Sequence, residues 1–463
     1  MAAPEPDAGG GAPGAPRGTG LGAVLGRPNF SLLVVGQTGS QLGDRLHHMA
    51  LIALIGTAAE ASTSGIELAK LVSAITLPVV LFGPIVGALV DRWNKRTTMI
   101  VTDLLRAILV AFIPLLYREI GFIWPVYVIA FLVALLGLFF NSAKMALIPD
   151  LVSHGQLLSA NAALTSIGRF ATIAGVVGGG VIISWTIWER LGWQGYEAGF
   201  YIDALSYGLS VATLLLIGRG YRPRAGRSDD LHFDSAEAAA VVKGEMKHLA
   251  SDIRATLGLI RRNHDLRFVF FTVVLLGVLA ASIFVILTAS VQTVMGLGTR
   301  SVGYLGGLLA AGMIVGSLGV GTIGKAWNKR HIVLFGCFLM GAFMIVGAFY
   351  FSYQMFAPIA FLGGMVLGPV MISQDTLVHE VAPPDARALI FSTRDLVLGA
   401  AFMGAALAVG AGVPLLEALG AEESYRLALF VFGVLITAAA VGGELAVLRD
   451  ERAATRNSAT RAP

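Results

Sequence analysis

Apolar runs long enough to cross a bilayer as helices repeat along most of the chain. Six lie at about 30–57, 68–90, 97–117, 123–143, 161–186 and 199–218, and six more at about 268–292, 301–324, 331–352, 354–379, 390–415 and 424–447. A helix of about 20 apolar residues spans the hydrocarbon core, whereas a membrane β-barrel requires alternating apolar and polar positions. Because these runs are continuous, the pattern predicts an all-α polytopic membrane protein with twelve transmembrane helices.

One long polar segment separates the two sets of spans and divides the chain into two halves. The predicted parts are a disordered cytoplasmic leader, an N-terminal six-helix bundle, a cytoplasmic linker, a C-terminal six-helix bundle and a cytoplasmic tail, at 1–28, 29–218, 219–266, 267–447 and 448–463. Apolar residues recur at helical spacing within the linker, at Met246, Leu249, Ile253, Leu257 and Ile260. They predict an amphipathic helix that lies on the inner membrane face or packs against the cytosolic surface of the protein.

Composition narrows the class of protein further. Of the 463 residues, 56% are hydrophobic and 13% are charged, whereas an average soluble protein is about a quarter charged. This balance excludes a soluble globular enzyme and a disordered protein, and the single cysteine, Cys337, excludes an intrachain disulfide. The net charge of +4 does not indicate a nucleic-acid partner, because the basic residues lie mainly in the connections between spans.

The distribution of basic residues predicts the orientation of the chain. With the amino terminus placed inside, 25 of the 33 Lys and Arg residues fall on the cytoplasmic side, five on the outer side and three within spans. Cytoplasmic connections of membrane proteins carry the excess of positive charge. We therefore expect a multi-pass protein of the cell (inner or plasma) membrane with both termini in the cytoplasm.

Two short sequences recur at equivalent positions of the two halves. GALVDRWNKR at 87–96 is repeated as GTIGKAWNKR at 321–330, and MALIPDL at 145–151 has a weaker counterpart, DTLVHEV, at 375–381. Each copy falls in the corresponding cytoplasmic connection of its half. Parallel repeats of this kind are typical of transporters whose halves are related by an axis along the membrane normal, so the sequence predicts two pseudo-symmetric six-helix bundles.

The segment 87–96 resembles the loop between helices two and three of the major facilitator superfamily, Gly-x-Leu-x-Asp-Arg-x-Gly-Arg-Arg/Lys. The matching residues are Gly87, Leu89, Asp91, Arg92, Lys95 and Arg96. Asn94 replaces the usual glycine, and asparagine also tolerates a left-handed backbone. GQTGSQLGDRLHHMAL at 36–51 and PPDARALIFSTRD at 383–395 are similar to the drug and siderophore exporters of that family, which include macrolide- and enterobactin-exporter-like proteins.

The resemblance implies two bundles that rock about a central cavity, often with exchange of a proton for the exported solute. It also implies that Asp91 bridges the halves in the outward-facing state, with Arg394 and Asp395 as candidate partners. The remaining residues of the expected cytoplasmic gate are Gly87, Arg92, Lys95, Arg96, Asp150 and Glu380. Asp150 and Glu380 occupy equivalent repeat positions and suit gating or helix capping, and a basic loop that only orients the chain would also explain Lys95 and Arg96.

The fifth predicted helix partly matches the exporter-associated pattern Gly-Pro-x-x-Gly-Gly, with Val176 in place of the proline. The resemblance assigns helix packing to its glycines, Gly175, Gly178, Gly179 and Gly180.

Polar residues within the first and third spans are the candidate site, because charges at mid-bilayer are costly and demand a reason. Gln37, Gln41, Asp44 and His48 follow one another at helical steps and predict a cavity-lining face with Asp44 as a proton-binding group. Arg45 adjoins this face, and Asp103 and Arg106 form an i, i+3 pair within reach of Asp44. The alternative is a set of ion pairs that only locks the bundle. Asp203 is expected at the start of the sixth helix, where an acid interacts favourably with the helix dipole.

These features predict a proton-coupled exporter of a drug-like, siderophore-like or other amphipathic small molecule, which works by alternating access as a monomer in the lipid bilayer. A lipid flippase or a proton-independent facilitator of the same fold is the first alternative, and a non-transporting membrane sensor or assembly protein is the second. No GxxxxGK[ST] segment is present, so no ATP-binding loop is expected. We expect no enzymatic activity and no metal, nucleotide or redox cofactor.

Overall fold

The computed structural model describes residues 20–217, 235–323, 328–421 and 423–459. Most of the expected leader, the first part of the linker and the end of the tail fall outside the described residues. Where the leader is described, residues 21–25 form a short helix, α1 (Leu21–Leu25), instead of the expected disordered chain. The reason is that Val24 is fully buried in an apolar cluster with Phe30 and Leu33.

Twelve long helices form the body of the described chain, and no strand occurs among the described residues. The first six are α2 (Pro28–Ala58), α3 (Ala61–Arg92), α4 (Lys95–Ile120), α5 (Trp124–Leu151), α6 (Leu157–Ile183) and α8 (Gly195–Leu216). The second six are α10 (His264–Ala289), α11 (Gly298–Ile323), α12 (Lys329–Phe349), α13 (Tyr353–Val381), α14 (Arg387–Ala418) and α15 (Ser424–Ala459). The predicted all-α architecture is confirmed, and in the described parts of the chain eleven helices are long and apolar enough to cross a membrane. The twelfth long helix, α2, carries the polar stripe of the first span.

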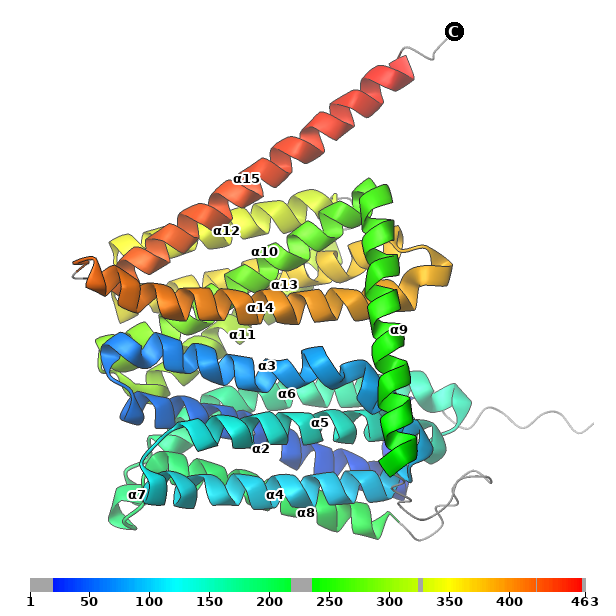
Figure 1. Ribbon diagram of the computed structural model, residues 1–463, viewed down its shortest axis with the longest axis vertical. Helices are drawn as coiled ribbons and strands as arrows, with labels where there is room; N and C mark the ends of the chain where they lie inside the picture. The colour runs from blue at the N-terminus through cyan, green and yellow to red at the C-terminus, as the bar shows by residue number, and fades with distance from the viewer. Residues whose placement is uncertain (1–19, 218–234, 324–327, 422, 460–463) are drawn as a thin grey trace, which may run out of the picture.

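The two sets of six helices pack as separate bundles with matching internal contacts (Figure 1). In the first bundle α2 packs on α6 and α8, α3 on α5, and α4 on α5 and α8. The equivalent pairs of the second bundle are α10 with α14 and α15, α11 with α13, and α12 with α13 and α15. The bundles meet through α3 against α14 and α6 against α11, which are also equivalent pairs. The pseudo-symmetry indicated by the sequence repeat is therefore present in the packing.

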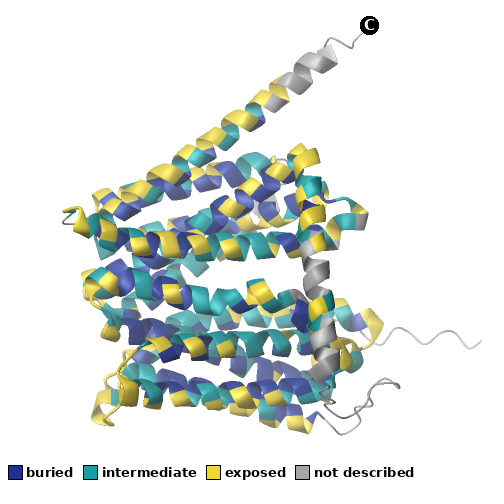
Figure 2. Cartoon of the chain, viewed as in Figure 1, coloured by how far each residue is buried: buried dark blue, intermediate teal, exposed yellow. Residues whose placement is uncertain are grey.

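The outer surface of the bundles is apolar. Large hydrophobic side chains on it are exposed, among them Phe112, Leu205, Phe335 and Leu435, and exposed positions are spread over the outward faces of the helices (Figure 2). Such a surface suits contact with lipid, since a soluble protein rarely exposes apolar patches of this extent.

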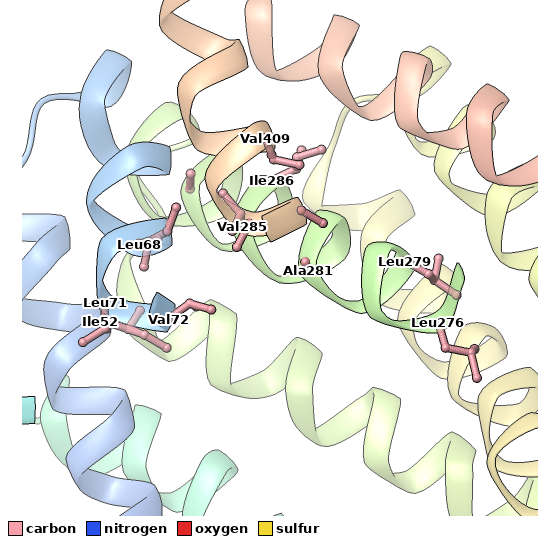
Figure 3. Packing of buried hydrophobic residues seen from close by; sticks show 14 of the residues in the cluster. Ile52, Leu68, Leu71, Val72, Leu276, Leu279, Ala281, Val285, Ile286 and Val409 are labelled. Carbon is pink, nitrogen blue, oxygen red and sulfur yellow. The ribbon is translucent and has the colours of Figure 1, made fainter. Parts of the chain in front are cut away.

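Between the bundles, an apolar seam joins α2 and α3 to α10 and α14. Leu68 and Val72 of α3 lie in one cluster with Val285 and Ile286 of α10 and with Val409 of α14 (Figure 3). Helix α9 (Ser235–Arg262) runs along one end of the molecule across both bundles and contacts α3 and α14 (Figure 1). We call this end the α9 end and the opposite one the far end.

The asparagines of the two repeated segments, Asn94 and Asn328, have the same structural role at the α9 end. The Asn94 Oδ1 accepts a hydrogen bond from Thr97 N at 3.1 Å, and the Asn328 Oδ1 accepts one from Arg330 N at 3.1 Å. Each asparagine is therefore the N-cap of the helix that follows. Asn94 has φ −66° and not the left-handed backbone considered from its replacement of glycine. Residues 324–327 lie outside the described residues.

The Lys95 side chain binds the backbone of the turn between α3 and α4. Its side chain is buried, and the Nζ donates to the carbonyl oxygens of Val90, Asp91 and Trp93 at 2.6, 2.9 and 3.1 Å. Val90 O also accepts from the Trp93 N–H at 3.1 Å, so Lys95 adds a second donor there and satisfies carbonyls that the end of a helix leaves free.

We expect Lys95→Met to lower the thermal stability of the purified protein, because it removes three hydrogen bonds from the carbonyl oxygens at the end of α3. The expected loss is about 1–3 kcal/mol, measured as a fall in melting temperature in detergent. Lys70→Met is the control, because the Lys70 side chain is half exposed and pairs only with Glu67 on its own helix. Equal melting temperatures for Lys95→Met and Lys70→Met would contradict this role.

Candidate functional site

Five ionisable or phenolic side chains from three helices converge inside the first bundle. Asp44 lies on α2, Asp103 and Arg106 on α4, and Asp203 and Tyr207 on α8. The approach of α2 to α8 depends on a glycine at position 43, because a Cβ there would overlap the side chains of Ser206 and Asp203. We call these five residues the acid–arginine cluster.

Arg106 is the centre of the cluster. Its Nη2 lies 2.6 Å from Asp44 Oδ1, and its Nη1 lies 3.2 Å from Asp103 Oδ1. The guanidinium carbon lies 4.1 Å from the centroid of the Tyr207 ring, which places the cation over the aromatic face. The Tyr207 hydroxyl donates a hydrogen bond to Asp44 Oδ1. One guanidinium therefore joins carboxylates from two helices to an aromatic ring from a third.

Asp203 forms the deepest part of the cluster, contrary to the position expected for it. Helix α8 begins at Gly195, where Glu197 and Gln194 form a capping box, so Asp203 lies more than two turns inside the helix. Its side chain is fully buried, its Oδ1 accepts from Ser206 Oγ at 3.2 Å, and its Oδ2 lies 3.4 Å from His47 Nδ1. The expectation that Asp203 lies at the start of its helix is wrong. The capping box starts the helix at Gly195, eight residues before Asp203.

The charges of the cluster do not balance if every acid is ionised. Three carboxylates surround one guanidinium, and among the described residues Asp103 Oδ2, Asp203 Oδ2, Arg106 Nε and His47 Nδ1 have no hydrogen-bond partner. A buried charge without compensation is costly in a membrane, so bound protons, together with the nearby Lys144, must offset the excess negative charge. The open carboxylate oxygens are positions at which the cluster can hold them.

Other members of the stripe on α2 face the neighbouring helix α6. A Cβ on Gly168 would lie 2.7 Å from the Gln41 amide oxygen, and a Cβ on Gly175 would lie 2.5 Å from the Arg45 Cβ. Gln37 is buried, and His48 is partly buried with its ring 5.9 Å from that of His47. The stripe thus packs the first bundle together around the acid–arginine cluster.

The four glycines of α6 that are expected to pack helices together differ in what surrounds them. Gly175 lies against Arg45, Gly179 against Met49, and Gly180 against Gly303 of α11, where a Cβ would approach the Gly303 Cα to 3.2 Å. A Cβ on Gly178 would meet nothing within 4 Å. Close packing therefore requires three of the four glycines, and Gly178 does not share the packing role expected for it.

The expected gate residues are distributed over contacts within each half. Arg394 Nη1 lies 2.6 Å from Asp375 and its Nε 3.0 Å from Asp395, so Arg394 is paired inside the second bundle in this structure. Glu380 pairs with Lys329 at 2.9 Å. Both basic residues therefore pair with acids of the second half.

The remaining gate residues lie around the start of α4 and the ends of α3 and α5. Asp91 and Arg92 are exposed at the end of α3, and Asp150 lies in the last turn of α5. Arg96 donates to the carbonyl oxygens of Leu214 and Leu215 at 2.8 and 2.9 Å and so caps α8. A Cβ on Gly87 would meet nothing within 4 Å.

A cavity of about 460 Å³ lies between the two bundles. The first bundle contributes residues of α2 and α6, including Met49, Ile52 and Val176, and most of the wall comes from the second bundle. Four phenylalanines and three methionines line it, and the polar side chains in its wall are Thr172 and Thr288. None of the seven residues predicted to line a cavity or bind a proton lines this cavity, so their predicted cavity-lining role does not apply to it.

Sequence reasoning missed Tyr207 and placed Asp203 wrongly, although one signal was available. The two residues lie four positions apart and share a helix face with Ser206 and Ser210, which gives α8 a polar stripe comparable to that of α2. The described part of the chain holds no group of three or more His, Cys, Asp or Glu side chains suited to a metal ion.

These features define the class of protein: a multi-pass membrane transporter built from two pseudo-symmetric six-helix bundles around a cavity. The model of the Major Facilitator Superfamily matches residues 33–394, and the chain belongs to that family. It is therefore a transporter and not an enzyme.

Similar curated proteins include exporters. The multidrug efflux pump Tap of Mycolicibacterium fortuitum is 23% identical over 80% of this chain and 87% of its own length. Macrolide efflux protein A of Enterococcus faecalis is 24% identical over 57% of this chain and 75% of its own. The MFS-type transporter YfiS of Bacillus subtilis is 28% identical, but the match covers 40% of this chain and 42% of YfiS.

Solved structures share the fold. A bacterial homologue of the human lysosomal transporter Spinster superposes with a TM-score of 0.67 and 13% identity, over 90% of this chain and 96% of that one. An auto-inhibited peptide transporter of the POT family superposes with a TM-score of 0.66 and 14% identity, over 91% and 97%.

Proposed function

We propose that this protein is a proton-coupled exporter of hydrophobic or amphipathic small molecules that works by alternating access. Both termini face the cytoplasm, so the far end faces outward, and the protein acts as a monomer. The observation that carries the proposal is the buried acid–arginine cluster, in which Arg106 lies between Asp44 and Asp103. The apolar cavity and the similarity to efflux proteins support the substrate class and the direction.

The charge count of the cluster and its place in the bundle support proton coupling. Asp44 is the least enclosed carboxylate of the cluster, since 29% of its side chain is exposed while those of Asp103 and Asp203 are fully buried. A proton on Asp44 removes the charge that pairs with Arg106 and leaves the guanidinium to Asp103. Asp44 and Met49 lie five positions apart on α2, in which each residue adds about 1.5 Å of rise. A shift of α2 at the cluster therefore also moves the cavity wall.

The far end is closed by side chains of the second bundle that bind backbone groups of the first. The Gln292 Nε2 donates to the carbonyl oxygen of Ile52 at 2.8 Å. The Tyr425 hydroxyl donates to the carbonyl oxygen of Ala61 and accepts from the Gly65 N–H, both at 2.9 Å. In an alternating-access cycle these bonds must break when the cavity opens outward.

We expect Gln292→Leu to favour opening of the far end, because the variant loses the cross-bundle hydrogen bond but keeps much of the side-chain volume. One net hydrogen bond changes the closed-to-open ratio roughly fivefold. The readout is labelling of Val302→Cys, a cavity-wall position, by a membrane-impermeant maleimide added to intact cells in a Cys337→Ala background.

Gln374→Leu is the matched control for Gln292→Leu. The Gln374 side chain is also buried, but it bonds to Thr272 and Val269 of its own bundle. Faster labelling in Gln292→Leu than in Gln374→Leu is expected, and equal labelling rates in the two variants would contradict the closing role of Gln292.

The proposed function itself is tested by an efflux screen. Cells that overproduce the wild-type protein are compared with cells carrying Asp44→Asn, matched for protein amount, across neutral and cationic hydrophobic compounds. The proposal expects reduced accumulation of at least one compound in wild-type cells alone. A protein that is well produced but changes the accumulation of none, in cells or in proteoliposomes, would contradict it.

A further inference from the structure

The cavity between the bundles differs from the acid–arginine cluster in chemistry and in place. The described cavity wall contains no Asp, Glu, Lys, Arg or His side chain. An ionised ligand in this volume would lose its hydration without gaining an opposite charge, which is strongly unfavourable. The wall therefore selects against permanent cations and anions.

Two hydroxyl groups interrupt the apolar wall, and their hydrogen bonding differs. Thr172 Oγ1 donates to the carbonyl oxygen of Gly168, one turn earlier in α6, at 2.9 Å. On helix α10, the hydroxyls of Thr272 and Ser282 likewise donate to carbonyl oxygens one turn earlier. Thr288 belongs to the same helix as these two and is only 4% exposed, yet among the described residues its hydroxyl has no hydrogen-bond partner.

A hydroxyl that lines a cavity without a hydrogen-bond partner in the protein is available to bind a polar group of a ligand. Its desolvation is uncompensated when the cavity holds an apolar molecule without hydrogen-bonding atoms. The three methionines, Met49, Met340 and Met344, add flexible and polarisable surface that adapts to ligands of different outline. The cavity therefore accepts ligands of different shapes, but it excludes charged ligands and favours those with one hydrogen-bonding group.

We propose that the cavity binds uncharged, mainly apolar molecules that carry one hydrogen-bonding group, and that Thr288 is the residue that recognises this group. This inference rests on the proposed transport function and specifies its substrate class. Cargo and proton then occupy different places, the cargo beside α10 and the proton in the cluster of α2, α4 and α8. The cargo needs no contact with Asp44 or Arg106.

The test uses three probes, two of which differ only in the hydrogen-bonding group and the third of which carries a permanent charge. N-phenyl-1-naphthylamine is neutral and has one N–H group, 1-benzylnaphthalene replaces that group by CH₂, and tetraphenylphosphonium is a permanent cation. Binding to the purified wild-type protein in lipid nanodiscs is measured by displacement of radiolabelled N-phenyl-1-naphthylamine. We expect the amine to bind about fivefold more tightly than its CH₂ analogue, and the cation to compete at least tenfold more weakly than the amine.

The matched variants are Thr288→Val and Thr172→Val, which remove a hydroxyl from the same cavity at nearly constant volume. Thr288→Val is expected to abolish the fivefold preference for the amine, while Thr172→Val retains it because the Thr172 hydroxyl is already bonded. Equal preferences in the two variants, tight binding of the cation, or no saturable binding of the amine would each overturn the proposal.

A parallel transport assay separates this inference from the proposed function. Both neutral probes are followed in proteoliposomes of the same wild-type protein and the same two variants. Binding with the expected preference but without transport would contradict the proposed function and leave the inference about the cavity intact. Transport by the wild-type protein that is equal for the amine and its CH₂ analogue would overturn the inference and leave the transport function intact.

Discussion

Replacement of Asp44 by asparagine is expected to abolish transport against a concentration gradient while the protein still folds. Asparagine has nearly the shape of the acid and still accepts hydrogen bonds from Arg106 and Tyr207, but it cannot take up or release a proton. Uptake of N-phenyl-1-naphthylamine into inverted vesicles should therefore fall to the rate measured after the pH gradient is dissipated. Downhill exchange of the probe should remain.

Two controls accompany this prediction. Asp44→Glu keeps a proton-binding carboxyl group and should retain part of the gradient dependence. Asp395→Asn removes a carboxylate that is paired with Arg394 at the α9 end, outside the acid–arginine cluster, and should keep most of it. A functional Asp44→Asn protein with full dependence on the pH gradient would show that the coupling proton binds elsewhere.

Removal of the central cation is expected to have the largest effect on stability. Arg106→Met leaves three carboxylates around an apolar side chain, and breaking a buried ion pair in this way costs about 3–5 kcal/mol. We expect little folded protein in detergent, measured as the monodisperse fraction in size-exclusion chromatography and as the melting temperature. Arg106→Lys keeps the charge but not the planar fork, so it should recover part of the folded yield.

The control for Arg106→Met is Arg300→Met. Arg300 also bonds to a tyrosine and lies over its ring, but this pair is exposed at the start of α11. Exposed substitutions of this kind change stability by about 0.5 kcal/mol or less. Equal losses of folded protein in Arg106→Met and Arg300→Met would refute the central role of Arg106 in the cluster.

Much of the fold is readable from the sequence because a bilayer restricts the backbone severely. Every spanning segment must satisfy its own backbone hydrogen bonds, so continuous apolar runs predict helices, and the repeated WNKR segment indicates two related halves. The pairing of Asp103 with Arg106 follows from helical spacing alone. The contact of Arg106 with Asp44 was predicted as possible, since only a few charges lie within the spans.

The contacts that close the far end and cap the helices could not be predicted, because they depend on partners that no sequence pattern shows. Gln292 and Tyr425 close the far end by binding backbone atoms of Ile52, Ala61 and Gly65, and a backbone acceptor has no residue signature. Lys95 and Arg96 read as gate residues by motif, yet in the structure they cap helix ends. Arg394 illustrates the same limit, since its nearest acids lie in its own bundle.

The position of the cargo site also required the three-dimensional arrangement. The polar stripe of α2 suggested that a cavity would lie beside Asp44, but the stripe faces α6 and α8, and the cavity is enclosed by apolar residues mainly of the second bundle. The unpartnered hydroxyl of Thr288 cannot be told from the bonded hydroxyl of Thr172 in the sequence.

The central claim is that movement of the cargo is coupled to movement of protons through the acid–arginine cluster. The most direct measurement is the pH inside proteoliposomes, followed with a trapped fluorescent indicator, while a gradient of N-phenyl-1-naphthylamine is imposed across the membrane and the potential is clamped. The account predicts that cargo flux through the wild-type protein changes the internal pH, and that an equal flux through Asp44→Asn does not. Cargo flux through the wild-type protein without any change of internal pH would contradict it.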